Sequence, residues 1–321
     1  MRVGLDAYTI HPLGLDPFQT LDFADQRGLE GVQFGGLGDD LGRMRDVRAR
    51  ADGLGLYCHT SVSSPNPCGH QGSAAELTGR LRGEIERAAA CGWRELHSSL
   101  GGTEERTGRP VPWARQLDAS RELLAGLGPV LRGHGCRIDL ETHGDATTWE
   151  LVRLAEAVGP DVLGICLDTA NVLLYEDPDA AARRAAPYTH LTHAKDGLLF
   201  FNDRGLMRQG RPPGEGVVDW RRILPLLAAH EPDLPLSIED HKRLFDAAFY
   251  EASYRATLPD LDAAELAALF RLAWDCEKRL GSGGLPAPSV YEAIPFTEQL
   301  EGRLASGRDY LKGLVAELGL C

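Results

Sequence analysis

The chain has 321 residues, of which 43% are hydrophobic and 25% are charged, and its formal net charge is −13. These proportions are typical of a folded globular protein and exclude a disordered or low-complexity chain. The excess of negative charge argues against nucleic acid as a partner, because the phosphate backbone would be repelled.

Short strand-like runs alternate with longer amphipathic segments from the first residues onward. The expected strands cover residues 2–8, 31–34, 55–61, 94–100, 136–142, 162–168, 188–194 and 234–239. The expected helices cover residues 17–28, 40–53, 74–91, 113–134, 146–158, 177–186 and 219–230. Eight successive β/α units predict a parallel sheet that closes into a (β/α)8 TIM barrel, with an open doubly wound sheet as the alternative.

Two segments depart from this repeat. Residues 197–218 follow the seventh strand, contain several Gly and Pro residues, and predict a long loop of the kind that usually serves function. Apolar helical patterns at 262–280 and 297–318 predict a C-terminal helical extension. We therefore expect a barrel over residues 1–242 and an extension over 243–321, packed on the barrel or on a partner.

Features that direct a protein to a compartment are also readable. The chain begins on a strand-like run, and no apolar stretch approaches the roughly 18 residues of a membrane span. The seven cysteines are odd in number, scattered, and form no C-x-x-C pair. This usage favours a reducing compartment without a disulfide framework. The expectation is a cytoplasmic protein without membrane contact.

Four consecutive strands carry polar residues at their carboxyl ends, where TIM barrels place their active sites. These residues are Glu141, Asp168, His193 and Glu239. Singly, each has an ordinary structural explanation, such as a helix cap, a core histidine or an ion pair with arginine. Together they place three carboxylates on one rim, and a divalent cation relieves the resulting repulsion. Three oxygen ligands and one nitrogen suit Mn²⁺ best, with Mg²⁺, Co²⁺ or Zn²⁺ as alternatives.

Further candidates lie on the same strand faces. His143 follows Glu141 by two residues and is an expected auxiliary base, with a rim histidine bound to a backbone carbonyl as the alternative. Lys195 shares the face of His193, where it can steady an enolate oxygen. The expected substrate contacts are Asn171, Arg211, Glu215, His241 and His59. For the pair Arg211 and Glu215, a solvated surface pair is the alternative.

Five blocks of the sequence carry a resemblance to a known family. They are ETHGD (141–145), CLDTANVL (166–173), HLTHAKD (190–196), GEGVVDW (214–220) and LSIED (236–240). In order and spacing they resemble the signature blocks of the sugar phosphate isomerase/epimerase family, which belongs to the xylose-isomerase-like TIM barrels. The likeness is clearest over the last four strands of the barrel.

The resemblance implies roles for particular residues. Glu141, Asp168, His193 and Glu239 would be the metal ligands, and in the ketose epimerases of the family the two glutamates also exchange protons with the substrate. Asn171 stands where such epimerases carry a histidine, which argues against a strict ketose 3-epimerase.

The chemistry of such a site leaves three outcomes open. Removing a proton beside a carbonyl leaves an enediolate, whose charge a divalent metal stabilises as a Lewis acid. Returning the proton to either face gives epimerisation, returning it to the neighbouring carbon gives isomerisation, and a β leaving group gives elimination. We expect an isomerase or epimerase acting on a keto-sugar or polyol-derived carbohydrate.

Two alternatives remain from the resemblance. The first is a lyase, either a dehydratase or a subunit that cleaves C-glycosides of 3-keto sugars, with a small non-identical partner or a homo-oligomer explaining the C-terminal addition. The second is an endonuclease IV-like nuclease. That resemblance would imply a multi-zinc site with additional histidines. The acidic charge of this chain disfavours DNA as a partner.

Overall fold

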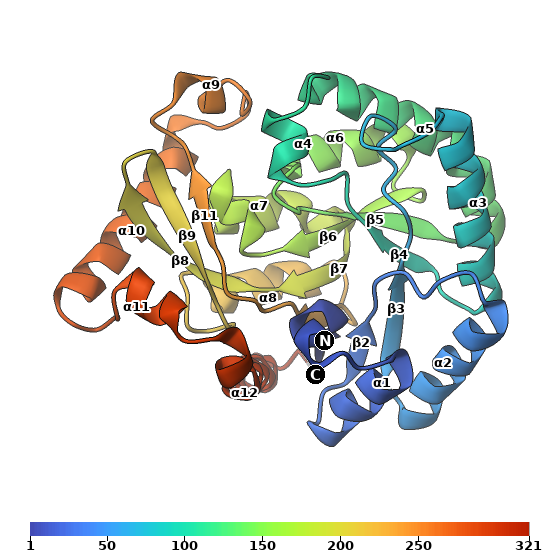
Figure 1. The fold of residues 1–321 in the computed structure, drawn as a ribbon, viewed down its shortest axis with the longest axis horizontal. Coiled ribbons are helices and arrows are strands. Elements are labelled where there is room, and N and C mark those ends of the chain that lie inside the picture. Colours follow the sequence, from blue (N-terminus) through green and yellow to red (C-terminus); the bar gives the residue numbers. More distant parts are fainter. Residues whose placement is uncertain (321) are drawn as a thin grey trace.

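The computed structural model describes residues 1–320, in which eight parallel strands close into a barrel (Figure 1). Around the barrel the order is β1-β10-β7-β6-β5-β4-β3-β2. The strands are β1 (Arg2–Asp6), β2 (Gly31–Gln33), β3 (Tyr57–Ser61), β4 (Glu95–Ser98), β5 (Arg137–Glu141), β6 (Leu163–Asp168), β7 (Thr189–Ala194) and β10 (Pro235–Ile238). Each lies within an expected run, so the TIM barrel is confirmed and the open sheet is wrong.

Helices surround the barrel where the amphipathic pattern predicts them. They are α1 (Pro17–Gln26), α2 (Leu41–Leu54), α3 (Ala74–Ala90), α5 (Trp113–His134), α6 (Thr148–Val158), α7 (Pro178–Ala185) and α8 (Trp220–Ala228). Three of them, α1, α3 and α6, begin with a capping box, in which the first side chain and the third helical residue satisfy each other's backbone donors. Local sequence thus fixes where the connections between strands and helices occur.

The segment at 197–218, expected as a loop, is largely a β-hairpin. Strands β8 (Asp196–Asn202) and β9 (Gly205–Arg211) pair with β11 (Leu244–Ala247) in an antiparallel sheet beside the barrel (Figure 1). Its apolar residues are buried because α10 (Ala263–Gly281) covers them: Leu198 clusters with Cys276 of that helix. The third strand comes from a distant part of the chain, so the local pattern held no sign of the sheet.

The expected C-terminal helices are present as α10 and α12 (Phe296–Glu317). The short helix α9 (Ala252–Arg255) precedes α10, and the short helix α11 (Pro288–Ala293) lies between α10 and α12 in chain order. Leu300 and Leu311 of α12 belong to the barrel core, whereas α10 packs on β8. The division into 1–242 and 243–321 stays a prediction.

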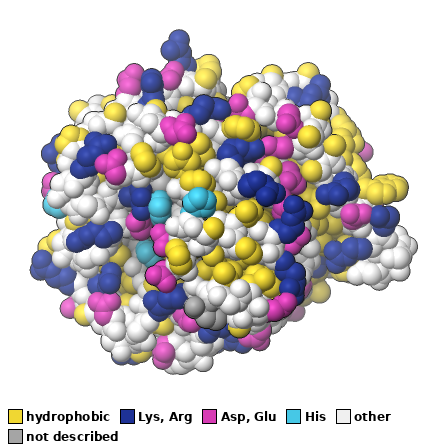
Figure 2. Space-filling model, turned by 180° about the vertical axis from the view of Figure 1, so that it is seen from behind, with side chains coloured by type: hydrophobic (Ala, Val, Ile, Leu, Met, Phe, Trp, Pro, Cys, Tyr) yellow, Lys and Arg dark blue, Asp and Glu magenta, His cyan; other side chains and the backbone are white. Residues whose placement is uncertain are grey.

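Three further findings concern membrane-spanning helices, the cysteines and the charged surface. Within residues 1–320, every helix is too short or too polar to cross a membrane. The described cysteines, which exclude Cys321, are all free. Acidic and basic side chains are interspersed over the face shown in Figure 2, and histidines gather near its middle.

Two glycines at the floor of the barrel make room for one aromatic side chain. Tyr57 projects into the space that side chains at Gly4 and Gly31 would fill, and its hydroxyl lies 2.9 Å from Ser237 Oγ. A Cβ added at Gly4 would lie 2.2 Å from the Tyr57 hydroxyl oxygen and 2.5 Å from the Gly31 carbonyl oxygen. The barrel interior therefore has no free volume at this point.

We expect Gly4→Ala to lower the free energy of unfolding by about 1–3 kcal/mol, because the Gly31 carbonyl belongs to a strand and cannot move away. Urea denaturation measures the change. The matched control is Gly53→Ala in α2, where no heavy atom lies within 4 Å of the added Cβ. It should be neutral or stabilising by up to about 1 kcal/mol. Equal midpoints for the two variants would contradict the packing argument.

Candidate functional site

Four predicted side chains converge at the carboxyl ends of β5, β6, β7 and β10. One ligand atom from each of Glu141, Asp168, His193 and Glu239 lies within 4.8 Å of the others, and all four residues are buried. His193 Nδ1 lies 3.1 Å from Glu141 Oε1 and 3.2 Å from Glu239 Oε2. We call these four residues the rim quartet.

The histidine of the quartet is oriented as a metal ligand would be. Its Nδ1 is buried and has no hydrogen-bond partner among the described atoms. Its Nε2 lies 2.5 Å from Gln33 Nε2 and 3.4 Å from Asp6 Oδ2. Nδ1 is thus the ring nitrogen that faces the carboxylates of Glu141 and Glu239. With a cation at Nδ1, the ring proton would lie on Nε2, where Asp6 Oδ2 can accept it. A buried ring nitrogen among buried carboxylates is a donor set that fits a divalent cation.

Lys195 lies at the edge of the quartet and balances part of its charge. Its Nζ is 2.7 Å from Glu239 Oε2 and 3.2 Å from Asp168 Oδ2. Burial alone would raise the pKa of Glu239, but the charges of Lys195 and His193 hold that pKa well below its usual range. Burial raises the pKa of Asp168, and Lys195 opposes the rise. Glu239 is thus kept ionised.

Asn171 links the quartet to the hairpin sheet. Its Nδ2 donates to Asp168 Oδ2 at 2.6 Å and lies 3.4 Å from Glu141 Oε1. Its Oδ1 accepts a hydrogen bond of 2.6 Å from Nη1 of Arg208 on β9. The amide therefore sits with one end on the acidic ligands and the other end on a buried arginine.

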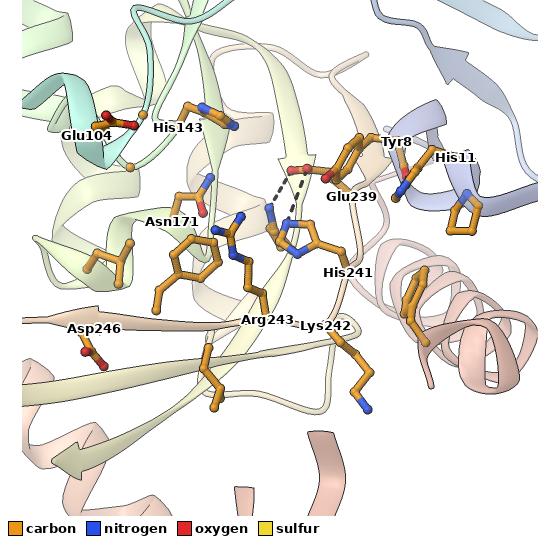
Figure 3. A pocket seen from close by; sticks show the side chains of 18 of the residues that line it. Tyr8, His11, Glu104, His143, Asn171, Glu239, His241, Lys242, Arg243 and Asp246 are labelled. Atoms are coloured by element: carbon orange, nitrogen blue, oxygen red, sulfur yellow. Dashed lines mark hydrogen bonds and ion pairs between the residues drawn. The ribbon is translucent and has the colours of Figure 1, made fainter. Parts of the chain in front are cut away.

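A cavity of about 1030 Å³ borders the quartet at Glu239. Of the residues expected at the site, it is lined by Glu239, Lys195, His143, Asn171 and His241. Figure 3 shows side chains from the barrel rim on one side and from the chain around β11 on the other. The predicted catalytic rim and the hairpin sheet together enclose this space.

The position of His143 is compatible with an auxiliary base at the site and with a rim histidine bound to a backbone carbonyl. It lines the cavity, and its Nδ1 lies 2.6 Å from the Gly101 carbonyl oxygen. The Glu141 carboxylate raises the pKa of His143 to about 9. In this arrangement the imidazole is charged near neutral pH. The catalytic role of His143 stays a prediction.

The sequence matches the model of a known protein family. The model of the xylose isomerase-like TIM barrel family matches residues 21–266. The chain belongs to this family. The resemblance drawn from the five sequence blocks is thereby confirmed at family level. No curated protein matches the chain in sequence.

Solved structures resemble this xylose isomerase-like barrel at low sequence identity. D-psicose 3-epimerase in the presence of D-fructose shares 14% identity over 87% of this chain and 99% of that chain, with a TM-score of 0.61. The 3-keto-D-glucoside 4-epimerase of E. coli shares 16% over 80% and 97%, with a TM-score of 0.59. A xylose isomerase-like TIM barrel protein from Mycobacterium smegmatis in complex with magnesium shares 17% over 80% and 89%, with a TM-score of 0.55. These likenesses establish the fold.

Three expected substrate contacts do not line the cavity of this xylose isomerase-like barrel. His59 lies on β3 beside Tyr57, with ring centroids 5.5 Å apart, and burial lowers its pKa to about 4. Arg211 is buried with its guanidinium 3.4 Å from the centre of the Tyr291 ring. Glu215 is exposed and accepts a hydrogen bond of 2.9 Å from Ser306 Oγ of α12. Strand pairing in the hairpin sheet, which the sequence did not reveal, directs Arg211 toward Tyr291 of α11, and Glu215 follows the end of β9.

Other residues at the site were missed. Gln33 contacts His193, and His97 Nε2 lies 3.1 Å from Glu141 Oε2. Both lie near the carboxyl ends of their strands, so the rule that found the quartet would also have found them on β2 and β4. Arg208 carried no such signal, because its segment was expected to be a loop.

One carboxylate organises the chain that follows β7. Asp196 accepts backbone hydrogen bonds of 2.8 Å from Gly197, 3.0 Å from Gly214 and 3.1 Å from Val218, and one of 3.1 Å from Trp220 Nε1. The block 214–220 therefore folds back onto Asp196. Burial raises its pKa to about 6, so the group is ionised at neutral pH.

We expect Asp196→Asn to lower the free energy of unfolding by about 1–3 kcal/mol, because the amide NH2 of asparagine would face one of the four donors. Urea denaturation at neutral pH checks this expectation. The control is Asp203→Asn at the exposed tip of the hairpin, which should change stability by less than about 0.5 kcal/mol. An unchanged midpoint for Asp196→Asn would show that the donors find other partners.

Proposed function

We propose that the protein is a divalent-metal-dependent enzyme that transfers a proton next to the carbonyl of a keto-sugar, as an isomerase or epimerase does. The observation that carries the proposal is the convergence of Glu141 and Glu239 with Asp168 and His193 within 4.8 Å, beside a cavity that Glu239 lines. The two glutamates come from β5 and the end of β10, with β6 and β7 between them in the barrel. They therefore approach a bound sugar from different sides.

The donor set would hold the cation through the carboxylates of Glu141, Asp168 and Glu239 and through Nδ1 of His193. Mn²⁺ fits such a mixture of oxygen and nitrogen ligands best, with Mg²⁺, Co²⁺ and Zn²⁺ as alternatives. When bound, the cation supplies Lewis-acid stabilisation of the negative charge that develops on substrate oxygens. The neighbour solved with magnesium supports a divalent ion.

The side chains supply the proton transfers. Glu239, held ionised by Lys195, accepts the carbon-bound proton at a carboxylate oxygen. Glu141 delivers or removes a proton on the other face, which inverts the carbon. Protonated His143 donates to a substrate oxygen in the cavity, and Lys195 lowers the energy of an enolate nearby. These are the catalytic roles proposed for the four residues.

A second candidate is elimination from a 3-keto-glycoside. The favouring observation is the size of the cavity, about 1030 Å³, at the upper end of the 300–1000 Å³ typical of small-molecule sites. That volume exceeds what one sugar ring needs and leaves space for an aglycone. The same carbanion then expels a β leaving group. A homo-oligomer or a small partner subunit and a cytoplasmic location remain part of this proposal.

The test combines metal content with solvent deuterium exchange. After Mn²⁺ loading, we expect about one ion per chain in the wild type and none in the double variant Glu141→Ala/His193→Ala. The exchange panel is a set of keto-sugars, and deuterium should enter next to the carbonyl of at least one of them. Release of an aglycone from 3-keto-glycosides would identify the lyase. Failure to bind a divalent metal under any loading condition would overturn the proposal.

A further inference from the structure

One buried arginine beside the cavity has no ion-pair partner. Arg208 on β9 is 1% exposed. Its Nη1 donates to Asn171 Oδ1, whereas its buried Nε has no hydrogen-bond partner. Among residues 1–320, no carboxylate oxygen lies within the 4.0 Å of an ion pair. Burying an unpaired guanidinium is costly, so a partner that the chain itself does not supply is expected.

A second arginine lies on the same wall. Figure 3 shows Arg243 pointing into the cavity toward Asn171 and His241. The Phe245 ring holds both arginines, with its centre 4.5 Å from the Arg208 guanidinium and 4.7 Å from that of Arg243. Arg243 also lacks a carboxylate within ion-pair distance in the described part of the chain.

A neighbouring arginine shows that pairing is available on this wall. Arg204 also lines the cavity, but it forms ion pairs of 2.7 Å with Glu251 and 3.4 Å with Asp246. Arg208 and Arg243 are therefore left free on a protein with a net charge of −13, where acidic partners are abundant. Arg243 lines the cavity, and Arg208 lies directly behind two of its lining side chains, Asn171 and Phe245. Together the two unpaired guanidiniums mark a site for an anion.

We propose that Arg208 and Arg243 bind an anionic oxygen group of the substrate, a carboxylate or a phosphate ester. The planar guanidinium matches both groups through paired hydrogen bonds. Asn171 and Phe245, the two side chains in contact with Arg208, both line the cavity, so the bound group would lie there. The substrate is thus a charged keto-sugar rather than a neutral one.

The connection through Asn171 locates this group relative to the reaction. The amide spans from Arg208 to Asp168 of the quartet with hydrogen bonds of 2.6 Å at each end. One side chain thus separates the anion site from the metal ligands, so the anionic group belongs to the sugar unit that reacts. This placement rests on the proposed function, whereas the anion site itself does not.

The test is calorimetric binding to the Mn²⁺-loaded protein, with inorganic phosphate, glucuronate and glucose as probes. We expect phosphate or glucuronate to bind at least about 10-fold more tightly than glucose. Arg243→Gln and Arg208→Gln should each weaken anion binding about 10- to 100-fold. Arg243→Gln, at an exposed position outside the quartet, should do so without changing Mn²⁺ affinity. Tighter binding of phosphate would identify a phosphate ester, and tighter binding of glucuronate would identify a carboxylate.

The control is Arg204→Gln, which removes a paired arginine from the same cavity and should leave anion binding within about 2-fold of the wild type. Equal loss in Arg204→Gln, unchanged anion binding in Arg243→Gln and Arg208→Gln, or no anion binding at all would overturn the proposal. Mn²⁺ binding is titrated separately. Absence of Mn²⁺ binding would count against the proposed function and not against the arginine pair, whose anion binding is then measured without metal.

Discussion

Glu239→Gln is expected to lower the rate of proton exchange next to the substrate carbonyl by about 10²- to 10⁴-fold, the usual contribution of a general base. Glutamine has nearly the same shape as glutamate and keeps one oxygen at the position where a ligand would bind, but its amide cannot take up a proton. The side chain is 5% exposed and fixed by Lys195, so the variant should keep the geometry of the site. The measurement is deuterium incorporation followed by NMR with a substrate from the exchange panel.

Two comparisons separate the catalytic role from other effects. Glu215→Gln changes an exposed glutamate outside the cavity and should alter the rate by less than about 2-fold. Metal content of Glu239→Gln, measured in parallel, shows whether a slow rate comes from a missing base or a missing ion. Exchange at the wild-type rate with metal bound would rule out Glu239 as the base and leave Glu141 as the candidate.

The barrel and its quartet were predictable because both depend on local pattern plus one rule of the fold. The strands β5, β6, β7 and β10 each carry a polar residue at or next to the carboxyl end, and a closed parallel barrel brings these ends to one rim. Glu141, Asp168, His193 and Glu239 needed only that rule. Gln33 and His97 obey it too, but a neutral amide and a lone histidine attract less notice than carboxylates.

The far wall of the cavity was not predictable in the same way. Its strands β8, β9 and β11 pair segments that lie far apart in sequence, and the run rich in glycine and proline looked like a loop. Without that pairing, nothing indicated that Arg208 is buried or that Arg243 faces the cavity. The position of Arg211 away from the cavity has the same origin, because the direction of its side chain depends on the strand partner rather than on its neighbours in sequence.

The cavity wall that the sequence did not predict bears on the proposed substrate. The quartet alone describes a reaction that many neutral keto-sugars can undergo, since proton transfer requires only a carbonyl and an adjacent C–H bond. The hairpin sheet adds an aromatic ring and two unpaired guanidiniums within one side chain of the quartet. We therefore propose that substrate choice in this protein depends on the part of the fold that departs from the simple β/α repeat.

Saturating Mn²⁺ is expected to raise the melting temperature of the wild type. At a concentration of 100 times Kd, binding to the folded state alone adds about 2.7 kcal/mol to the free energy of unfolding. For a chain of this length that corresponds to about 5 °C. The physical reason is that buried carboxylates around His193 Nδ1 lose their mutual repulsion when a cation binds.

His193→Ala should abolish this rise, because it removes the one nitrogen donor and leaves three carboxylates that hold a divalent ion less firmly. His230→Ala, at an exposed position outside the quartet, should keep the full rise. Scanning calorimetry with and without EDTA measures both. An equal rise in the melting temperature of His193→Ala would mean that Mn²⁺ binds exposed acidic groups elsewhere, because loss of His193 must weaken the binding of an ion in the quartet.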